Sequence, residues 1–241
     1  GKRCWLHGAS DQEWTFFFPH KKRGKEAMDE ADILPHFQGV LCHDHWKPYY
    51  RYTDCAHALC NAHHLRELER AWEHDEMKWA KNMQNLLKNI NNAQIDNGLI
   101  LDKDAQAHYR LAYQKILADG DVECPAPDKT LRKEGQRGRL KRTKSRALLE
   151  RLRKFEDDVL RFMTRVDVPF TNNQGENDIR MTKVHQKISG CFRSDQGAEM
   201  FCLIRSYLST CRKQKVTASD ALNLLFKNQL PDIFVINQVA E

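Results

Sequence analysis

The sequence predicts an α/β protein in which a helical segment interrupts the part that forms the sheet. Three observations support this fold class. Apolar and aromatic runs typical of strands lie before residue 61, apolar residues at helical intervals fill residues 77–165, and helical patterns return from residue 173 onward. A chain of 241 residues, 41% hydrophobic and 30% charged, is long enough to bury a core and has a globular composition.

The first part of the chain predicts four strands and two helices. Residues 4–9 and 14–18 flank a polar turn, which is typical of a β-hairpin. Residues 40–44 form a continuous apolar run, which is typical of a strand covered on both faces in a mixed or parallel sheet. The remaining elements are a helix at 24–33 that ends near Pro35, a strand at 57–60 and a helix at 62–74.

Only helices are predicted beyond residue 76. They are expected at residues 77–94, 102–117, 144–165, 173–188 with a stop at Gly190, 196–213 and 217–227. The helix at 196–213 has one stripe of residues that predicts a core contact: Phe201, Ile204, Leu208 and Cys211. We therefore expect three regions: residues 1–76 as the first part of the core, 77–165 as a helical insertion, and 166–241 as the rest of the core with C-terminal helices.

The composition argues against a membrane or secreted protein. No run approaches the roughly 18 apolar residues that a membrane helix needs, and the first residues lack the apolar stretch of a signal peptide. The eight cysteines lie in apolar contexts rather than at framework spacings, which suits reduced thiols. The sequence thus predicts a cytosolic protein without disulfides.

The positive charge is concentrated in one stretch. Lysine and arginine outnumber aspartate and glutamate by 39 to 33, and residues 129–154 hold a cluster of cations against only Glu134 and Glu150. The cluster is either a solvated loop and helix face or a surface that contacts nucleic-acid phosphates, and its density favours the second interpretation. The candidate DNA contacts here are Arg139, Lys141, Arg142 and Lys144.

Asp44 is the first candidate for chemistry. It stands at the carboxyl end of the apolar strand predicted at residues 40–44, which is where open α/β sheets place ligands and reactive groups. An Asp at this place also suits a turn before Trp46. The residue pattern leaves both interpretations open.

Glu176 is the second candidate. On a helix it shares one face with Arg180, Lys183 and Lys187, while Met181, Val184 and Ile188 form a separate apolar stripe. A carboxylate among cations can bind a divalent metal while the cations hold a phosphodiester. However, Asn173-x-x-Glu176 also resembles a capping box, and spacing alone favours that structural role.

Other chemical motifs are weak. Cys60-x-x-His63 offers two ligands at helix-turn spacing, which is too few for a zinc site and favours a closely packed turn. The sequence contains neither Gly-x-Gly-x-x-Gly nor a Walker A motif, so nucleotide-dependent chemistry has no support.

Three segments carry a resemblance to a known family: residues 39–49, residues 60–68 and, above all, residues 168–193, which read VPFTNNQGENDIRMTKVHQKISGCFR. On these segments the chain closely resembles the DDE transposases of the insertion-sequence sixty-six family, and the resemblance runs essentially from end to end. It implies an RNase H-like fold, in which a mixed sheet is flanked by helices and interrupted by an α-helical insertion.

The resemblance implies an enzyme that cleaves and transfers DNA strands at the ends of a mobile element. Such enzymes hold two Mg²⁺ ions, for which Mn²⁺ can substitute, with an Asp, Asp, Glu triad. Asp44 matches the second acid and Glu176 the third. The first Asp is expected immediately upstream of Gly1, so we expect this chain to be a catalytic-domain fragment that cleaves DNA poorly by itself. Cys60 and His63 match a Cys-x-x-His with a structural role.

The resemblance also implies partners. These are double-stranded DNA at the terminal repeats of the element and at the target, further copies of the chain on that DNA, and accessory transposition proteins, without a membrane. The expected place is the bacterial cytoplasm, at the nucleoid. Besides the basic stretch, the expected DNA contacts are Arg180, Lys183, Lys187 and Arg193.

Two alternatives stay open at this point. The chain can be a non-catalytic, DNA-binding remnant of a transposase that keeps the cations without turnover, which the missing first Asp favours. It can also be an RNase H-like nuclease with other substrates, which the basic helical insertion makes less favourable.

Overall fold

The computed structural model describes residues 4–98, 100–128, 140–190 and 192–234. It is mixed α/β and 62% helical, and it divides into two compact units. The hairpin unit comprises residues 1–37 and 173–241, and the helical unit comprises residues 38–172. The predicted division at residues 76 and 165 stays a prediction. Within the described ranges, no helix is long and apolar enough to cross a membrane.

The hairpin unit begins with the antiparallel strand pair that the sequence predicts. β1 (Trp5–Ser10) and β2 (Thr15–His20) are joined by a turn in which Oδ1 of Asp11 accepts from the N–H groups of Glu13 (2.8 Å) and Trp14 (2.6 Å). The other elements are α1 (Lys25–Glu30), α7 (Asn173–Ser189), α8 (Asp195–Lys213), α9 (Ala218–Phe226) and 3₁₀ helices at Leu34–His36 and Asp232–Phe234.

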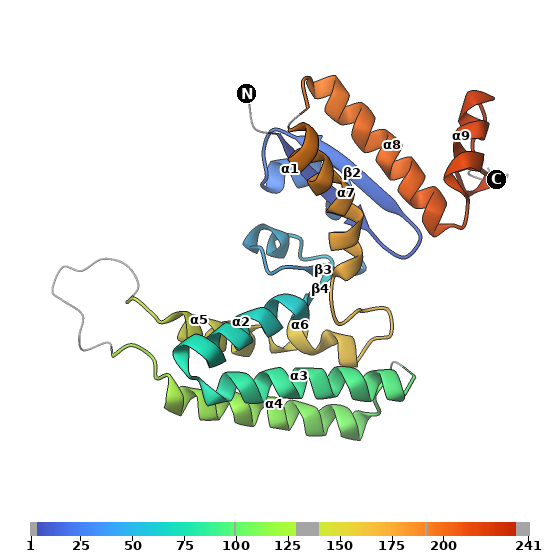
Figure 1. Cartoon of the computed structure of the whole chain (residues 1–241). Helices are drawn as coiled ribbons and strands as arrows, with labels where there is room; N and C mark the ends of the chain where they lie inside the picture. Colours follow the sequence, from blue (N-terminus) through green and yellow to red (C-terminus); the bar gives the residue numbers. More distant parts are fainter. Residues whose placement is uncertain (1–3, 99, 129–139, 191, 235–241) are drawn as a thin grey trace. The chain divides into compact units, whose positions relative to one another are not determined.

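Helix α8 runs along β2 (Figure 1), and two of its hydroxyl groups bind the strand backbone. The N–H of Phe17 donates to Oγ of Ser206 (2.8 Å). Oγ1 of Thr210 accepts from the N–H of Thr15 (3.1 Å) and donates to the carbonyl of the same residue (3.2 Å). The helix therefore supplies hydrogen-bond partners that a third strand would otherwise supply.

The apolar stripe predicted for α8 is confirmed only in part. Cys211 is buried, and Phe201 and Leu208 are half-buried, whereas Ile204 is 48% exposed. The buried residues of the helix are Ala198, Cys202, Ser209, Thr210 and Cys211. These side chains are small, so the helix can approach β2 closely enough for its hydroxyl groups to reach the backbone.

The helical unit combines one strand pair with a set of helices. β3 (Val40–His43) and β4 (Ala56–Leu59) pair in parallel, as the apolar run predicts, with Val40 opposite Ala56 and His43 opposite Leu59. The other elements are α2 (Asn61–Asp75), α3 (Lys78–Asp96), α4 (Lys103–Glu123), α5 (Lys144–Lys154), α6 (Glu156–Leu160) and 3₁₀ helices at Lys47–Arg51 and Arg161–Met163.

A large buried cluster lies entirely within the helical unit. Helices α3 and α4 lie side by side (Figure 1) and contribute Trp79 and Tyr113, which are both fully buried. Gly120 in α4 is required by this packing, because a Cβ there would lie 2.7 Å from Cδ1 of Leu149 and 3.1 Å from the Trp79 ring. The helical insertion predicted between the strands and the C-terminal helices therefore provides much of the core.

The helix predicted at residues 144–165 is broken. Phe155 leaves the helical region (φ −116°, ψ 32°), so α5 ends at Lys154 and two shorter helices follow. The ring centroid of Phe155 lies 4.4 Å from that of His45 and 4.9 Å from that of Tyr50. Aromatic packing at this point outweighs continuation of the helix.

The α/β class is confirmed in a mostly helical form. Within the described residues, the strands form two separate two-stranded sheets, one antiparallel and one parallel. The RNase H-like arrangement stays a prediction.

Candidate functional site

Asp44 lies where two parallel strands end together. It follows β3, while Cys60 follows β4, and the N–H of Cys60 donates to the carbonyl of His43 (3.0 Å). Asp44 is exposed, and its Oδ1 accepts from the N–H of Trp46 (3.2 Å). Both features predicted for this residue are therefore present: the place at a strand end and the turn contact.

A pocket of about 260 Å³ opens beside Asp44 in the helical unit. It combines two acids, two arginines and four histidines with a thiol. The lining residues are His43, Asp44, His45, Leu59, Cys60, His63, His64, Arg66, Glu67 and Arg151. Such a concentration of polar and charged groups in a concave site makes this pocket a candidate functional site.

The hydrogen bonds of His43 and His57 define which ring nitrogen donates and which accepts in each ring. Nδ1 of His43 accepts from the N–H of His45 (3.1 Å), so the proton of this ring sits on Nε2 and is donated to Nδ1 of His57 (3.1 Å). The remaining proton of His57, on Nε2, is donated to the carbonyl of Tyr52 (3.0 Å). All four ring nitrogens are thus used: one accepts from the N–H of His45 beside Asp44, one donates to the carbonyl of Tyr52, and the other two link the rings.

The electrostatics agree with this assignment. Burial, together with the nearby His57 and His45 rings, lowers the pKa of His43 to about 3. Burial and the cation of Arg151 lower the pKa of His45 to about 4. Neutral imidazoles near Asp44 are therefore expected at physiological pH.

A second fixed imidazole lines the pocket from α2. The side-chain amide of Asn61 donates to the carbonyl of Val159 (3.1 Å), so its Oδ1 faces His64 and accepts the proton on Nδ1 of that ring (3.1 Å). His64 is 2% exposed, and burial lowers its pKa to about 3. This ring too is neutral in the folded protein.

The pocket also contains cations that sequence reasoning did not single out. Arg151 of α5 forms an ion pair with Glu67 of α2, and Nε of Arg66 donates to the carbonyl of Ala62 (3.1 Å). Arg66 lies three positions after His63 on α2, so helical spacing from the Cys-x-x-His motif was the signal that could have found it. Arg151 comes from a distant helix and had no such signal.

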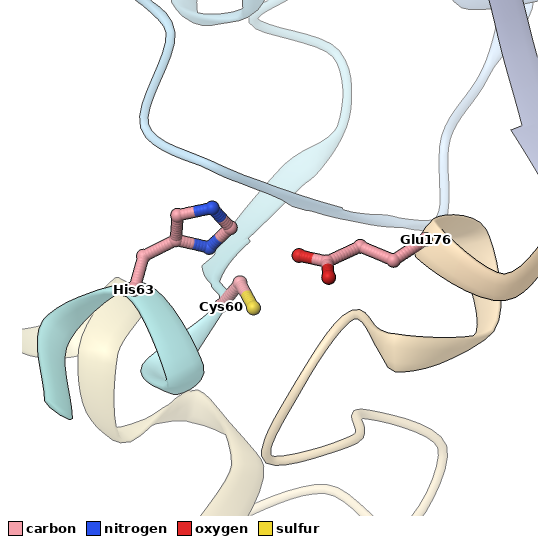
Figure 2. A group of neighbouring side chains, drawn as sticks. All are labelled: Cys60, His63 and Glu176. Atoms are coloured by element: carbon pink, nitrogen blue, oxygen red, sulfur yellow. The ribbon is translucent and has the colours of Figure 1, made fainter. Parts of the chain in front are cut away.

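Cys60 and His63 lie at the start of α2 (Figure 2), where Cys60 is the N-cap residue. Sγ of Cys60 accepts from the N–H of Asn172 (3.1 Å), and the N–H of His63 donates to the carbonyl of Cys60 (3.2 Å). The thiol therefore tethers the segment after Phe170 to the pocket. This contact suits the structural role that the sequence resemblance implies for Cys60.

Glu176 lies in the first turn of α7 in the hairpin unit, as the sequence predicts (Figure 2). It is exposed, and so are Arg180, Lys183 and Lys187 on the predicted shared face. The opposite side of the helix holds Asp178, which is 4% exposed and accepts from Nζ of Lys213 (2.9 Å). That ion pair fixes which face of α7 is turned outward.

The residues predicted to bind DNA differ in their surroundings. Lys141, Lys144 and Arg193 are exposed, whereas Arg142 forms an ion pair with Glu150. Arg139 lies outside the described residues. Further cations of the basic stretch, including Arg146 and Arg153, pair with acids of α4 and α5. The sequence alone therefore overstates the charge that this stretch offers to a partner.

The fold is α/β, and Asp44, at the end of a strand, lines a polar pocket that also contains two arginines. The family model "Transposase IS66 family" matches residues 1–200. Since this match covers most of the chain, the protein belongs to the IS66 family of transposases. No curated protein and no solved structure matches the chain.

Proposed function

We propose that the chain is the catalytic region of a DNA transposase, in which Asp44 and Glu176 hold Mg²⁺ for strand cleavage and transfer at the ends of a mobile element. The observation that carries this proposal is the exposed carboxylate of Asp44, at a parallel strand end and beside a pocket, in a chain of a transposase family. A first Asp, expected upstream of Gly1 from the resemblance, would complete the triad.

The carboxylates of Asp44 and Glu176 suit Mg²⁺ better than a softer metal. Mg²⁺ prefers carboxylate oxygen and water, and Mn²⁺ accepts the same ligands. His43 and His57 use all their ring nitrogens in hydrogen bonds, so these two rings do not compete as ligands. His45, His63 and Cys60 also line the pocket as nitrogen and sulfur donors, and the proposal assigns the metal to the carboxylates.

The protein side chains have separate tasks in this proposal. When bound, Mg²⁺ supplies charge stabilisation for attack on a phosphodiester. Asp44 and Glu176 hold it, while Arg66 and Arg151 place positive charge in the pocket wall, where it can orient a scissile phosphate. His43 and His57 keep the backbone around Asp44 in place.

Helix α7 supplies the main proposed DNA surface. Arg180, Lys183 and Lys187 are exposed on the face that carries Glu176, so a phosphodiester strand bound along this face would pass the carboxylate. Arg193, Lys141 and Lys144 are exposed as well and extend the proposal to both units. Double-stranded DNA, a homo-oligomer on that DNA and accessory transposition proteins are the proposed partners.

Calorimetric titration with Mg²⁺ and Mn²⁺ tests the proposal on this chain and on a chain extended upstream through the expected Asp. Asp44→Asn and Glu176→Gln should each abolish binding in the extended chain, because the ligand set loses a charged oxygen. Asp54→Asn removes an exposed Asp from the same unit and should leave binding unchanged. The extended chain should also cleave element-end DNA with Mg²⁺.

The opposite results have a clear meaning. If the extended chain binds neither ion, or if Asp44→Asn binds as the parent does, the proposed metal site is wrong. DNA binding without metal binding or cleavage would instead identify a non-catalytic remnant.

A further inference from the structure

A second pocket, of about 360 Å³, lies between the end of α8 and the start of α9 in the hairpin unit. It lies beyond residue 200, where the family match ends. Its lining is strongly cationic, and within the described part of the chain it contains no acid. The lining residues are Arg205, Leu208, Ser209, Arg212, Lys215, Val216, Thr217 and Ala218.

The cations of this pocket have few partners among the described residues. Nε of Arg205 is buried and has no hydrogen-bond partner among the described residues. Arg212 is 73% exposed and reaches a carboxylate oxygen of Asp178 only at 3.9 Å. The neighbouring Lys213 behaves differently, since its Nζ donates to two backbone carbonyls and to Asp178. A buried donor without a partner is unfavourable unless a ligand supplies the acceptor.

Lys215 stands at a position where a lysine is costly. The N–H of Val216 donates to the carbonyl of Cys211 (2.8 Å) and the N–H of Lys215 to that of Arg212 (3.2 Å), which is the Schellman pattern at a helix end. The φ of Lys215 is +63°, which is the left-handed conformation that favours glycine. The chain thus keeps a cation at the pocket where glycine would suit the backbone better.

The start of α9 adds to the positive potential. Thr217, the N-cap of this helix, and Ala218 line the pocket, so the positive end of the helix dipole lies at its wall. A small, strongly charged oxyanion fits a pocket with these donors better than a large apolar ligand does.

We propose that this pocket binds a phosphate of the DNA backbone through Arg205, Arg212 and Lys215, as an anchor separate from Asp44 and from the exposed face of α7. The proposal rests on the proposed function for its ligand, since it takes the phosphate from DNA. Phosphate contacts position a protein on DNA without reading sequence, so the pocket would contribute affinity rather than specificity.

Fluorescence anisotropy with a labelled DNA duplex, at several salt concentrations, tests the anchor. Arg205→Gln and Lys215→Gly should each weaken binding about threefold to tenfold, and the slope of log affinity against log salt should fall by about 0.9 for a lost phosphate. Lys227→Gln makes the same charge change at the other end of α9 and should stay within about twofold of the wild type.

Lys215→Gly separates binding from folding. Glycine suits the positive φ, so the variant should unfold at the same temperature as the wild type or above it while binding DNA more weakly. Wild-type affinity and salt slope in both pocket variants would overturn the anchor and leave the proposed function standing. A wild-type chain that binds no duplex at low salt would overturn both.

Inorganic phosphate distinguishes the source of the ligand. If phosphate alone raises the unfolding temperature of the wild type but not of Arg205→Gln, and DNA affinity is the same in both, the pocket takes a free anion and the DNA anchor is wrong. The result that supports the anchor is a joint loss of DNA affinity and salt slope in the pocket variants.

Discussion

The protonation states around Asp44 follow from single hydrogen bonds. Each nitrogen of His43 and His57 faces a group of known character, an N–H, a carbonyl or the other ring, so only one arrangement of protons satisfies all of them. The same reasoning fixes His64 through the amide of Asn61. The pKa values of His43 and His64 are lowered by burial, so these two rings stabilise the pocket as neutral groups and their protonation should weaken the fold.

His64 gives a testable pH dependence. Its pKa is about 3 in the folded protein and about 6.5 in the unfolded chain. The unfolded state therefore takes up a proton first as the pH falls. The contribution of His64 is complete above pH 6.5 and is lost progressively towards pH 3, by about 2 kcal/mol at pH 5.

Urea unfolding between pH 7.5 and pH 5 measures this effect. His64→Asn should be less stable at pH 7.5, because a buried ring is removed, but should lose about 2 kcal/mol less than the wild type on acidification. His108→Asn removes an exposed imidazole from α4 and should keep the wild-type slope. An unchanged slope in His64→Asn would show that His64 is not buried as a neutral ring.

At the level of elements, the contact between α8 and β2 depends on hydroxyl groups. Thr210→Val keeps the shape of the side chain but leaves the N–H and carbonyl of Thr15 without their partner in a buried position. We expect a loss of about 1–3 kcal/mol in the free energy of unfolding. Thermal and urea denaturation measure it. As a control, Ser219→Ala removes an exposed hydroxyl of α9 and should change the free energy of unfolding by less than about 0.5 kcal/mol. Equal stability of Thr210→Val and the wild type would contradict the contact.

The same contact shows what sequence patterns can and cannot predict. Hairpin, parallel strands and helices follow from alternation, apolar runs and helical spacing, because these patterns report local geometry. The buried face of α8 does not, since Ser206 and Thr210 are placed by a strand nearly two hundred residues away in sequence. The break at Phe155 has the same cause, because its aromatic partners lie near residue 50.

The candidate site was predictable to a similar extent. Asp44 and Glu176 lie at a strand end and in a first helical turn, which are local features that a sequence shows. The link between His43 and His57 depends on the register of two parallel strands, and the ion pair of Arg151 with Glu67 depends on packing between helices. Neither relation leaves a periodic signal.

The whole molecule places its largest core in one continuous segment. All residues of the buried cluster lie in the helical unit, and the chain passes between the two units only after residues 37 and 172. A polypeptide of residues 38–172 therefore keeps every side chain of that cluster, including Trp79, Leu87 and Tyr113. Since a domain needs its own core to fold alone, this segment should be an independent folding unit.

Expression of residues 38–172 tests this expectation. The segment should show helical circular dichroism and one cooperative unfolding transition. Leu87→Ala, at a fully buried position, should lower its stability by about 2–5 kcal/mol, whereas Leu111→Ala, at a leucine that is 68% exposed, should have little effect. If the segment unfolds without cooperativity, or if both substitutions have equal effects, its core depends on residues outside 38–172. A cooperative transition in the segment would instead show that the pocket around Asp44 rests on a fold that does not need the hairpin unit.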